Sequence, residues 1–371
     1  MIKITDLLLI IAAVNGFFFS ICLFSKKTNG KANRVFAILI FLLSLELIDS
    51  LLRSSLVRYF PQINMFFEPL PLLYGPLMYI YVVLATESSS KYHRLLTLSL
   101  LPFALSAVFQ LLMLSNHYNH LLTSIYRQYD LISIIYKFLD HYVSGILLLF
   151  FCVLSLIRIK EFRLRIGQFY SETAKINLSW LKTGFITAAI SSLLLIMTGL
   201  NNIYSIKYYY FFKFLLNLWI IGFIYICSFY AYMLPDVFKD IKDYKLFKAD
   251  KYGKDKLPDK IIQDNANTIL CFMKESKIFL EPDLTIEEFS KRININVHAV
   301  SQTINTHFNK NFFQFINDYR LETSVNFLLN NSTNKNILEI AMNSGFNSKA
   351  TFNRLFRNKY GKPPSTFRGI V

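Results

Sequence analysis

The sequence is poor in the residues from which disulfides, metal sites and catalytic centres are built. It contains four cysteines and six histidines among 371 residues, and neither type has the spacing of a disulfide framework or a metal site. Cys22, Cys152 and Cys227 lie in apolar runs, and we interpret the cysteines as small hydrophobic residues. No nucleotide-binding loop, phosphoacceptor domain or catalytic constellation is visible. We therefore expect a protein that is not an enzyme and that has no cofactor and no metal.

Charged residues are also scarce, and they are distributed unevenly. They make up 17% of the chain, whereas hydrophobic residues make up 53% and the mean hydropathy is +0.36. Residues 1–234 contain 19 Lys/Arg and 9 Asp/Glu, and residues 235–371 contain 21 and 15. This step near Pro235 predicts a membrane domain over 1–234, a charged linker over 235–258 and a water-soluble domain over 259–371. The net charge of +16 suits anionic lipid in the first part and phosphate in the last.

Long apolar runs fill the first part. A spanning helix needs ~20 mostly apolar residues to cross a hydrocarbon core about 30 Å thick. Seven segments meet this requirement, so we expect an all-α protein with a seven-helix transmembrane bundle. The predicted spans are Leu7–Phe24, Val35–Val57, Met65–Thr86, Leu95–Ser115, Tyr136–Ile157, Leu178–Leu200 and Tyr210–Leu234.

The distribution of lysine and arginine between the loops predicts the orientation. The loops after the first, third and fifth spans are rich in these residues, for example Lys26, Arg94 and Arg158, and the alternate loops are poorer. Because basic loops stay in the cytoplasm, we expect the N-terminus outside and everything after Leu234 inside. We therefore place the protein in the inner (cytoplasmic) membrane of a bacterial cell.

Several ionisable residues fall within the predicted spans. A charge at mid-membrane costs about 2.5–3.5 kcal/mol on insertion scales, so such residues usually face the bundle interior. Two interpretations stay open: a polar pocket for a signal ligand, or an interhelical network that fixes packing. The residues concerned are Glu46, Asp49, Arg53, Glu68, Asp140, His141 and Lys213.

A helical pattern of apolar residues leads into the soluble part. It runs from Lys260 to Phe279 and includes Ile261, Ala266, Ile269, Leu270 and Met273. These side chains either pair two protomers or pack against the following domain.

Two helix-turn-helix units are then predicted from the residues. In the first, Thr285 and Glu288 form a capping box, Asn294 suits a turn with positive φ, and Asn296 caps a second helix over Val297–Thr306.

The same scheme is repeated 51 residues later. Asn336 and Glu339 replace the first capping pair, Gly345 replaces Asn294, and Ser348 caps a helix over Lys349–Lys359. One long helix, Phe312–Asn331, is expected between the units.

The residues from Asp283 to Arg368 resemble the C-terminal domain of the AraC/XylS family of transcription regulators. The strongest stretch is ILEIAMNSGFNSKATFNRLFRNKYGKPPSTFR. A multi-span domain followed by such a module is similar to membrane-bound members of that family. The resemblance implies two recognition helices that enter successive major-groove segments of promoter DNA.

The resemblance also implies which side chains contact DNA. Gln302 or Asn353 can read adenine and Arg354 can read guanine, while Arg357 and Lys359 suit phosphates. The first recognition helix contains no lysine or arginine, so we expect it to bind weakly. Its expected contact residues, taken to be exposed, are His298, Ser301, Gln302 and Asn305, and those of the second helix are Lys349, Ala350, Asn353, Arg354 and Arg357.

The sequence thus predicts a membrane-bound one-component transcription regulator that senses an unknown signal. Expected partners are double-stranded promoter DNA, membrane lipid and an unknown ligand or membrane partner, with RNA polymerase and a homodimer as further options. Two alternatives stay open: a membrane interaction protein whose helix-turn-helix module docks proteins, and a transporter-like domain whose solute is also the signal.

Overall fold

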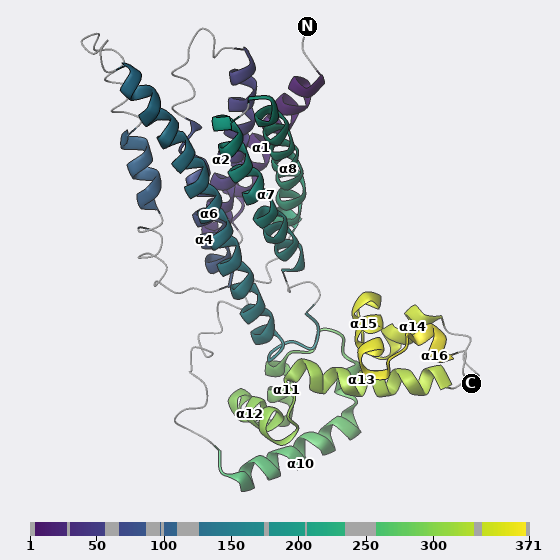
Figure 1. Cartoon of the computed structure of the whole chain (residues 1–371). Helices are drawn as coiled ribbons and strands as arrows, with labels where there is room; N and C mark the ends of the chain where they lie inside the picture. Colours follow the sequence, from purple (N-terminus) through teal and green to yellow (C-terminus); the bar gives the residue numbers. More distant parts are fainter. Residues whose placement is uncertain are drawn as a thin grey trace. The chain divides into compact units, whose positions relative to one another are not determined.

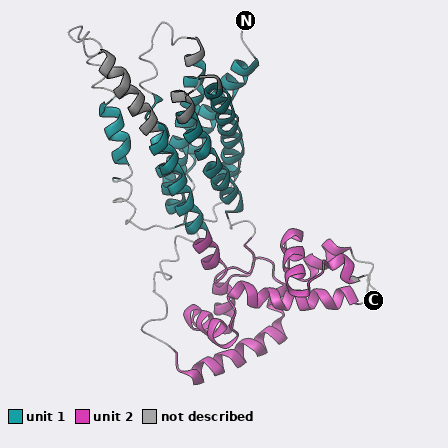
Figure 2. Ribbon diagram, in the orientation of Figure 1, with its two compact units in different colours: residues 1–159, 178–246 teal, residues 160–177, 247–371 magenta. Residues whose placement is uncertain are grey.

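The computed structural model divides the chain into two compact units (Figure 2). The first contains residues 1–159 and 178–246, and the second contains residues 160–177 and 247–371. The structure describes residues 4–27, 30–55, 67–86, 97, 100–109, 126–173, 178–204, 206–233, 257–329 and 336–368. The regular elements of these residues are helices, with one isolated β-bridge between Tyr170 and Thr285. The all-α prediction is therefore confirmed for the described part of the chain.

Long helices build the first unit (Figure 1). α1 packs on α2 and α8, α2 packs on α4, and α7 packs on α8. A shorter apolar helix covers Leu100–Phe109. The labelled helices are α1 (Ile4–Ser25), α2 (Gly30–Ser55), α4 (Pro71–Thr86), α6 (Tyr126–Ile166), α7 (Ser179–Tyr204) and α8 (Ile206–Met233).

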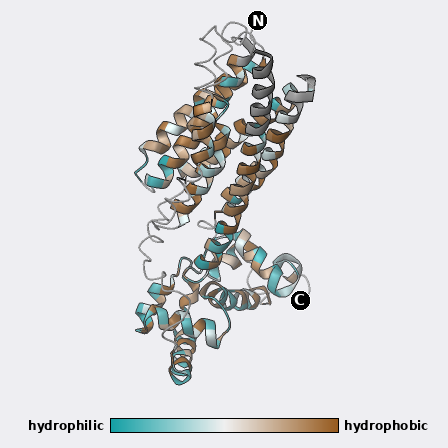
Figure 3. Ribbon diagram, turned by 60° about the vertical axis from the view of Figure 1, so that its left-hand side comes forward, coloured by the Kyte–Doolittle hydropathy of each residue, from teal (hydrophilic) through white to brown (hydrophobic). Residues whose placement is uncertain are grey.

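Among the described residues, five helical segments are long and apolar enough to cross a membrane, and Figure 3 shows their hydrophobic colouring. They are Ile4–Ser25, Gly30–Leu52, His141–Ile166, Ser179–Gly199 and Tyr208–Met233. The predicted spans Met65–Thr86 and Leu95–Ser115 coincide only in part with shorter apolar helices, Pro71–Thr86 and Leu100–Phe109. Other parts of those two spans lie outside the described residues. The number of seven spans is therefore not confirmed.

The helices of the first unit carry apolar side chains on their outer surface. On α1 the row Leu7, Ile11, Val14, Phe18 and Ile21 is between 46% and 66% exposed. Positions spaced by three or four residues lie on one side of a helix. An apolar face of this length suits contact with lipid rather than water.

The inner surfaces of these helices approach closely at small residues. A Cβ atom on Gly145 of α6 would lie 2.6 Å from Cγ1 of Ile196 and 3.0 Å from the carbonyl oxygen of Ser192, both on α7. Small residues at helix crossings are typical of membrane bundles, where close van der Waals packing replaces the hydrophobic effect.

The second unit contains short helices and one central long helix, α13 (Phe312–Leu329). α10 packs on α11 and α12, and α13 packs on α12, α14, α15 and α16. The other elements are α10 (Asp259–Ser276), the 3-10 turn η2 (Ile278–Leu280), α11 (Ile286–Ile293), α12 (Val297–His307), α14 (Ile337–Asn343), α15 (Lys349–Tyr360) and α16 (Pro364–Arg368).

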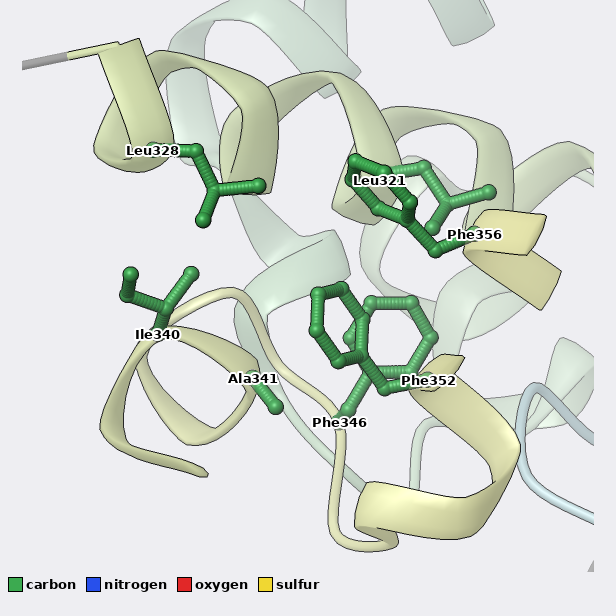
Figure 4. Packing of buried hydrophobic residues seen from close by; sticks show 7 residues of the cluster. All are labelled: Leu321, Leu328, Ile340, Ala341, Phe346, Phe352 and Phe356. Carbon is green, nitrogen blue, oxygen red and sulfur yellow. The ribbon is translucent and has the colours of Figure 1, made fainter. Parts of the chain in front are cut away.

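Aromatic and aliphatic side chains form the core around α13, α14 and α15 (Figure 4). The rings of Phe346 and Phe352 lie 5.2 Å apart, and those of Phe352 and Phe356 lie 5.5 Å apart. Removal of one such ring usually costs about 3–5 kcal/mol, so this core fixes α15 on α13. Its buried members are Leu321, Leu328, Ile340, Ala341, Phe346, Phe352 and Phe356.

The leading helix α10 packs into its own domain. Ala266, Ile269 and Met273 are fully buried within it, whereas Ile261 and Leu270 are exposed. The contacts of α10 with α11 and α12 favour the interpretation that this apolar pattern packs against the following domain.

The second unit also includes a segment from between two of the long helices. The predicted boundaries of 1–234, 235–258 and 259–371 assigned Lys160–Asn177 to the membrane domain. In the structure this segment belongs to the second unit together with residues 247–371.

Candidate nucleic-acid interface

The first helix pair, α11 and α12, is built by the caps that the sequence predicts. The backbone N–H of Glu288 donates to Oγ1 of Thr285 (3.2 Å), and the N–H of Thr285 donates to the Glu288 carboxylate (3.1 Å). Asn294 adopts a φ of 53°, and the Asn296 side chain accepts from the N–H of His298 (2.8 Å). These interactions satisfy helix N-terminal donors that lack partners within the helix.

The second pair, α14 and α15, repeats this construction. Asn336 and Glu339 form a reciprocal capping box with distances of 2.9 and 3.0 Å, and Ser348 accepts from the N–H of Thr351 at 3.3 Å. Gly345 has a φ of +90°, and a Cβ there would lie 2.7 Å from the carbonyl oxygen of Phe279. The turn between α14 and α15 therefore requires glycine both for its backbone conformation and for space.

α15 presents a polar face opposite its core residues. Ala350, Arg354 and Arg357 are exposed and Asn353 is half-buried, and their spacing places them on one side of the helix. Lys349 is exposed at the N-terminus of the helix. Within the described residues no carboxylate forms an ion pair with Arg354 or Arg357. The exposure expected for this helix is thus confirmed, apart from the half-buried Asn353.

Lys359, at the end of α15, has partners within the domain. Its ammonium lies 3.2 Å from Asp318 and 3.3 Å from Glu322. Burial acts against its charge, but the hydrogen bond to Asp318 and the charge of that carboxylate outweigh it, so the pKa of Lys359 is raised. The structure gives this lysine a role in holding α15 against α13, beside the phosphate contact that the sequence predicts.

The expected contact face of α12 is less accessible. His298 is exposed and Asn305 is half-buried, but Ser301 and Gln302 are only 7% and 6% exposed. The expectation that both of these side chains are exposed is therefore wrong. The reason is packing: α10, α11 and α13 all contact α12, and Val300 to Ile304 form a run of five buried residues.

Arg320 on α13 connects the two helix pairs, and its side chain is fully buried. Its guanidinium donates to the carbonyl oxygens of Phe279 (2.6 Å), Glu281 (2.6 Å) and Pro282 (3.2 Å). It also donates to the Ser171 hydroxyl (3.0 Å) and lies 5.9 Å from the Phe346 ring. This one side chain therefore holds the loop before α11 beside the core of the second pair.

Burial lowers the pKa of Arg320 to about 10, and the nearby carboxylates of Glu172 and Asp283 oppose this decrease. A value near 10 still leaves the guanidinium charged at neutral pH. A buried charge is tolerated when hydrogen bonds replace its water, as the carbonyl groups around Arg320 do.

The sequence interpretation did not identify Arg320 as a structural residue. Its position offered one signal: it lies one helical turn after Ile316 and one turn before Ser324, so it shares the inward side of α13. All three residues are buried. Ser171 and Glu172, which are also buried beside it, carried no comparable signal.

The first unit brings together part of the predicted intramembrane polar set. Lys213 of α8 forms an ion pair with Glu46 of α2, and the Tyr74 hydroxyl donates to the same carboxylate at 3.1 Å. Ser50 donates to Asn217 at 3.1 Å, again between α2 and α8. These contacts connect α2, α4 and α8.

The other members of the set differ in burial. Asp49 is fully buried, whereas Glu68 and His141 are half-buried. The side chains of Arg53 and Asp140 lie outside the described residues.

A small cavity lies beside Glu46 and Tyr74, and Leu148, Ser191 and Trp219 contribute to its wall. Its interior has room for about one water molecule, far less than the several hundred Å³ typical of a small-molecule site. In the described part of the first unit, these contacts favour a packing network over a ligand pocket.

Comparison with known families identifies the C-terminal part of the second unit. Residues 289–370 match a family model described as a helix-turn-helix domain. No curated protein and no solved structure shows significant similarity to the chain. The matched residues lie within the part of the sequence that resembles the AraC/XylS family. The chain therefore carries an AraC-type helix-turn-helix domain at residues 289–370, after an N-terminal region with several long apolar helices compatible with a membrane domain.

Proposed function

We propose that this chain is a membrane-bound one-component transcription regulator. α11 with α12 and α14 with α15 act as two helix-turn-helix units, and each inserts its second helix into the major groove of promoter DNA. A signal at the membrane domain changes how strongly this pair of units binds. The regulator has no catalytic activity of its own.

The exposed face of α15 is the observation that carries the proposal. Arg354 and Arg357 point away from the core and form no ion pair with described carboxylates, so both are available to DNA. Arginine binds the O6 and N7 atoms of guanine with two hydrogen bonds, and this contact discriminates between bases by about 1–3 kcal/mol. The capped, well-packed core holds the helix for such a contact.

For the membrane domain we propose seven spans, with the N-terminus outside and the AraC-type domain in the cytoplasm of an inner membrane. The five long apolar segments and the two shorter ones support the number, and the basic loops support the orientation. The cytoplasm is also where the chromosome lies, so the orientation and the DNA-binding domain agree.

The signal, in this proposal, acts on the packing of the spans. The contacts among Glu46, Tyr74 and Lys213 hold α2, α4 and α8 together. Polar contacts in a bundle interior are sensitive to small helix displacements, because a polar or charged group that loses its partner there costs free energy. A change in these contacts would change the arrangement of the helices that continue toward the soluble domain.

The direct test is capture of genomic DNA by the full-length protein in lipid nanodiscs, followed by sequencing. We expect enrichment of a few promoters that share a two-box site. A double variant, Arg354→Ala with Arg357→Ala, should lose this enrichment. Lys274→Ala is the matched control, because Lys274 is an exposed cation on α10, outside the two helix pairs.

A second function has one observation in its favour. Ser301 and Gln302 of α12 are buried and α12 carries no lysine or arginine, so the first unit is a poor DNA reader. In this alternative the module docks another protein. Weak retention of DNA that is indifferent to sequence and disappears with salt, equally in the double variant and the control, would favour the docking function.

A further inference from the structure

A short segment from outside the matched domain is built into the helix-turn-helix unit. Gly167–Glu172, the docked segment, directly follows α6 and lies more than a hundred residues before the helices that it contacts. The structure groups it with residues 247–371. Phe169 and Glu172 are 8% and 7% exposed, and Ser171 is fully buried, which is unusual for a loop because connecting segments normally run over the surface.

The backbone of the docked segment satisfies the first N–H groups of two helices. The N–H of Ile286 at the start of α11 donates to the carbonyl oxygen of Phe169 (2.9 Å), and the N–H of Phe313 in α13 donates to that of Gly167 (2.9 Å). The N–H of Ser171 donates to the carbonyl oxygen of Leu284 (3.1 Å). Helix N-terminal N–H groups have no acceptor within their own helix, and α11 and α13 each take one acceptor from this segment.

Side chains of α13 fix the centre of the docked segment. Nδ2 of Asn317 donates to the carbonyl oxygen of Ser171 at 2.8 Å, and Arg320 donates to the same oxygen at 3.3 Å and to the Ser171 hydroxyl at 3.0 Å. Asn317 and Arg320 are both buried, so these bonds form away from water, where leaving them unmade is most costly.

The end of the docked segment reaches α15. Oγ1 of Thr351, in the first turn of α15, lies 3.4 Å from the Glu172 carboxylate that accepts its hydrogen bond. The segment therefore contacts α11 of the first pair, the central helix α13 and α15 of the second pair. It lies at the joint that sets how the two pairs are placed relative to each other.

The two ends of the docked segment are tied to long apolar helices. α6 is continuous over Tyr126–Ile166, contains the candidate span His141–Ile166, and ends directly before Gly167. α7 begins at Ser179. By contrast, residues 234–258 separate α8 from α10, which is a longer connection along the chain. The shorter path from the spans to the joint thus passes through the docked segment.

We propose that the docked segment couples the membrane domain to DNA binding: a displacement of α6 moves Gly167–Glu172 and thereby changes the placement of the two helix pairs. This inference rests on the proposed function for its consequence at DNA. Two recognition helices bind one site together only when their separation matches the groove repeat of about 34 Å. A change at the joint therefore alters binding to a two-box site far more than binding to a single box.

The first test disrupts the docking in the full-length protein. Ser171→Pro removes the N–H that donates to Leu284, and Gln168→Ala is the control because Gln168 is exposed in the same segment. Amide hydrogen exchange in nanodiscs reads the docking through the N–H groups of Ile286 and Phe313. We expect Ser171→Pro to speed this exchange and to weaken two-box binding about tenfold or more, with single-box binding changed less than about twofold.

Faster exchange at Ile286 and Phe313 with unchanged two-box binding would overturn the coupling. Equal loss of one-box and two-box binding, with protection from exchange lost throughout α11 to α15, would mean that the substitution unfolds the domain. A second variant then decides: a glycine-serine spacer inserted after Ile166 keeps the residues that bond to α11, α13 and α15. It breaks the continuity with α6, including the backbone hydrogen bonds from Gly167 and Tyr170 to its last turn.

The spacer variant is compared with the natural chain in nanodiscs of short-chain and long-chain phosphatidylcholine. Bilayer thickness changes the tilt of spanning helices and so displaces α6 without a known ligand. We expect exchange at Ile286 and Phe313 to depend on thickness in the natural chain, and the spacer to abolish this dependence. The absence of any dependence in the natural chain, or its persistence with the spacer, would contradict the proposal. Because exchange is measured without DNA, failure of the proposed function is distinguishable from failure of the coupling.

Discussion

Outward-pointing cations distinguish the two helix pairs at the scale of single residues. Lys349, Arg354 and Arg357 are exposed on α15, whereas α12 has no lysine or arginine. Arg292, near α12 in sequence, is already bound to Glu281 by two hydrogen bonds of 2.6 and 2.9 Å. In the proposed function, base recognition by arginine therefore depends on α15.

We predict that Arg354→Ala weakens binding to the captured promoter site by ~1–3 kcal/mol, or about 5- to 150-fold in Kd, because a two-bond contact with guanine is lost. Fluorescence anisotropy with the full-length protein in nanodiscs measures the change. Lys274→Ala should have little effect. If Arg354→Ala left the preference between the site and its single-base variants unaltered, Arg354 would have no part in base recognition.

The thiol of Cys271 provides a pH-dependent probe of α10. A hydrogen bond from this exposed thiol to Glu275 (3.2 Å) and the charge of that carboxylate raise the pKa of Cys271. The thiolate is the reactive form, so alkylation becomes faster as the pH rises through this elevated pKa. Glu275→Ala removes both effects, and we expect faster alkylation at neutral pH, measured by mass spectrometry. Equal rates in the two proteins would show that Glu275 does not control the thiol.

Side-chain exposure on α15 was predictable from sequence, but exposure on α12 was only partly so. For α15, helical spacing from the buried Phe352 and Phe356 places Arg354 and Arg357 outside. For α12 the same reasoning fails at Ser301 and Gln302, because α10 and α13 pack on additional sides of the helix. Periodicity within one helix cannot report how many neighbours that helix has.

Helix caps organise the elements of the second unit. Capping boxes begin α11 and α14, and Asn311 and Gln314 make a third reciprocal pair at the start of α13, with distances of 2.8 and 3.0 Å. The sequence predicted the first two because threonine or asparagine followed by glutamate is a local signature. The third has the same spacing with glutamine as the partner, so it was accessible to the same reasoning.

We predict that Asn336→Ala destabilises α14 by ~1 kcal/mol, the usual cost of losing an N-cap. The cap accepts the N–H of Glu339 at 2.9 Å, and alanine leaves this donor without its acceptor. Hydrogen exchange of the α14 amides in the full-length protein measures the change. Asn336→Asp, which keeps the acceptor, should exchange like the natural chain, and equal protection in Asn336→Ala would show that the cap contributes little.

At the scale of the whole molecule, the two units differ in surface character. The apolar outer faces of the first unit suit lipid, and the charged residues of the second unit suit water. The proposed orientation predicts that Cys271 faces the cytoplasm. In a Cys22→Ser background, with Cys152 and Cys227 buried, a membrane-impermeant maleimide should label inside-out vesicles and spare intact spheroplasts. Labelling of intact spheroplasts would reverse the proposed orientation.

A change from an apolar first part to a charged last part could be seen in the composition step near Pro235, but the membership of Lys160–Asn177 in the second unit could not. Its contacts with α13 join residues separated by 149 positions, as in the bond from Arg320 to Ser171. Local patterns carry no information about such pairs. The polar residues Glu46 and Lys213 were predicted as members of one set, yet only the structure shows that they meet.

In the proposed function, the difference in charge between α12 and α15 gives the complex with DNA a direction. A DNA-binding domain with one cationic recognition helix and one without lysine or arginine has no internal symmetry. It therefore distinguishes the two ends of its DNA site. Inversion of that site in a promoter would reverse the protein on the DNA and move any surface that meets the transcription machinery to the far side. Regulation by this protein should therefore depend on the orientation of its DNA site, and not only on the distance of that site from the start of transcription.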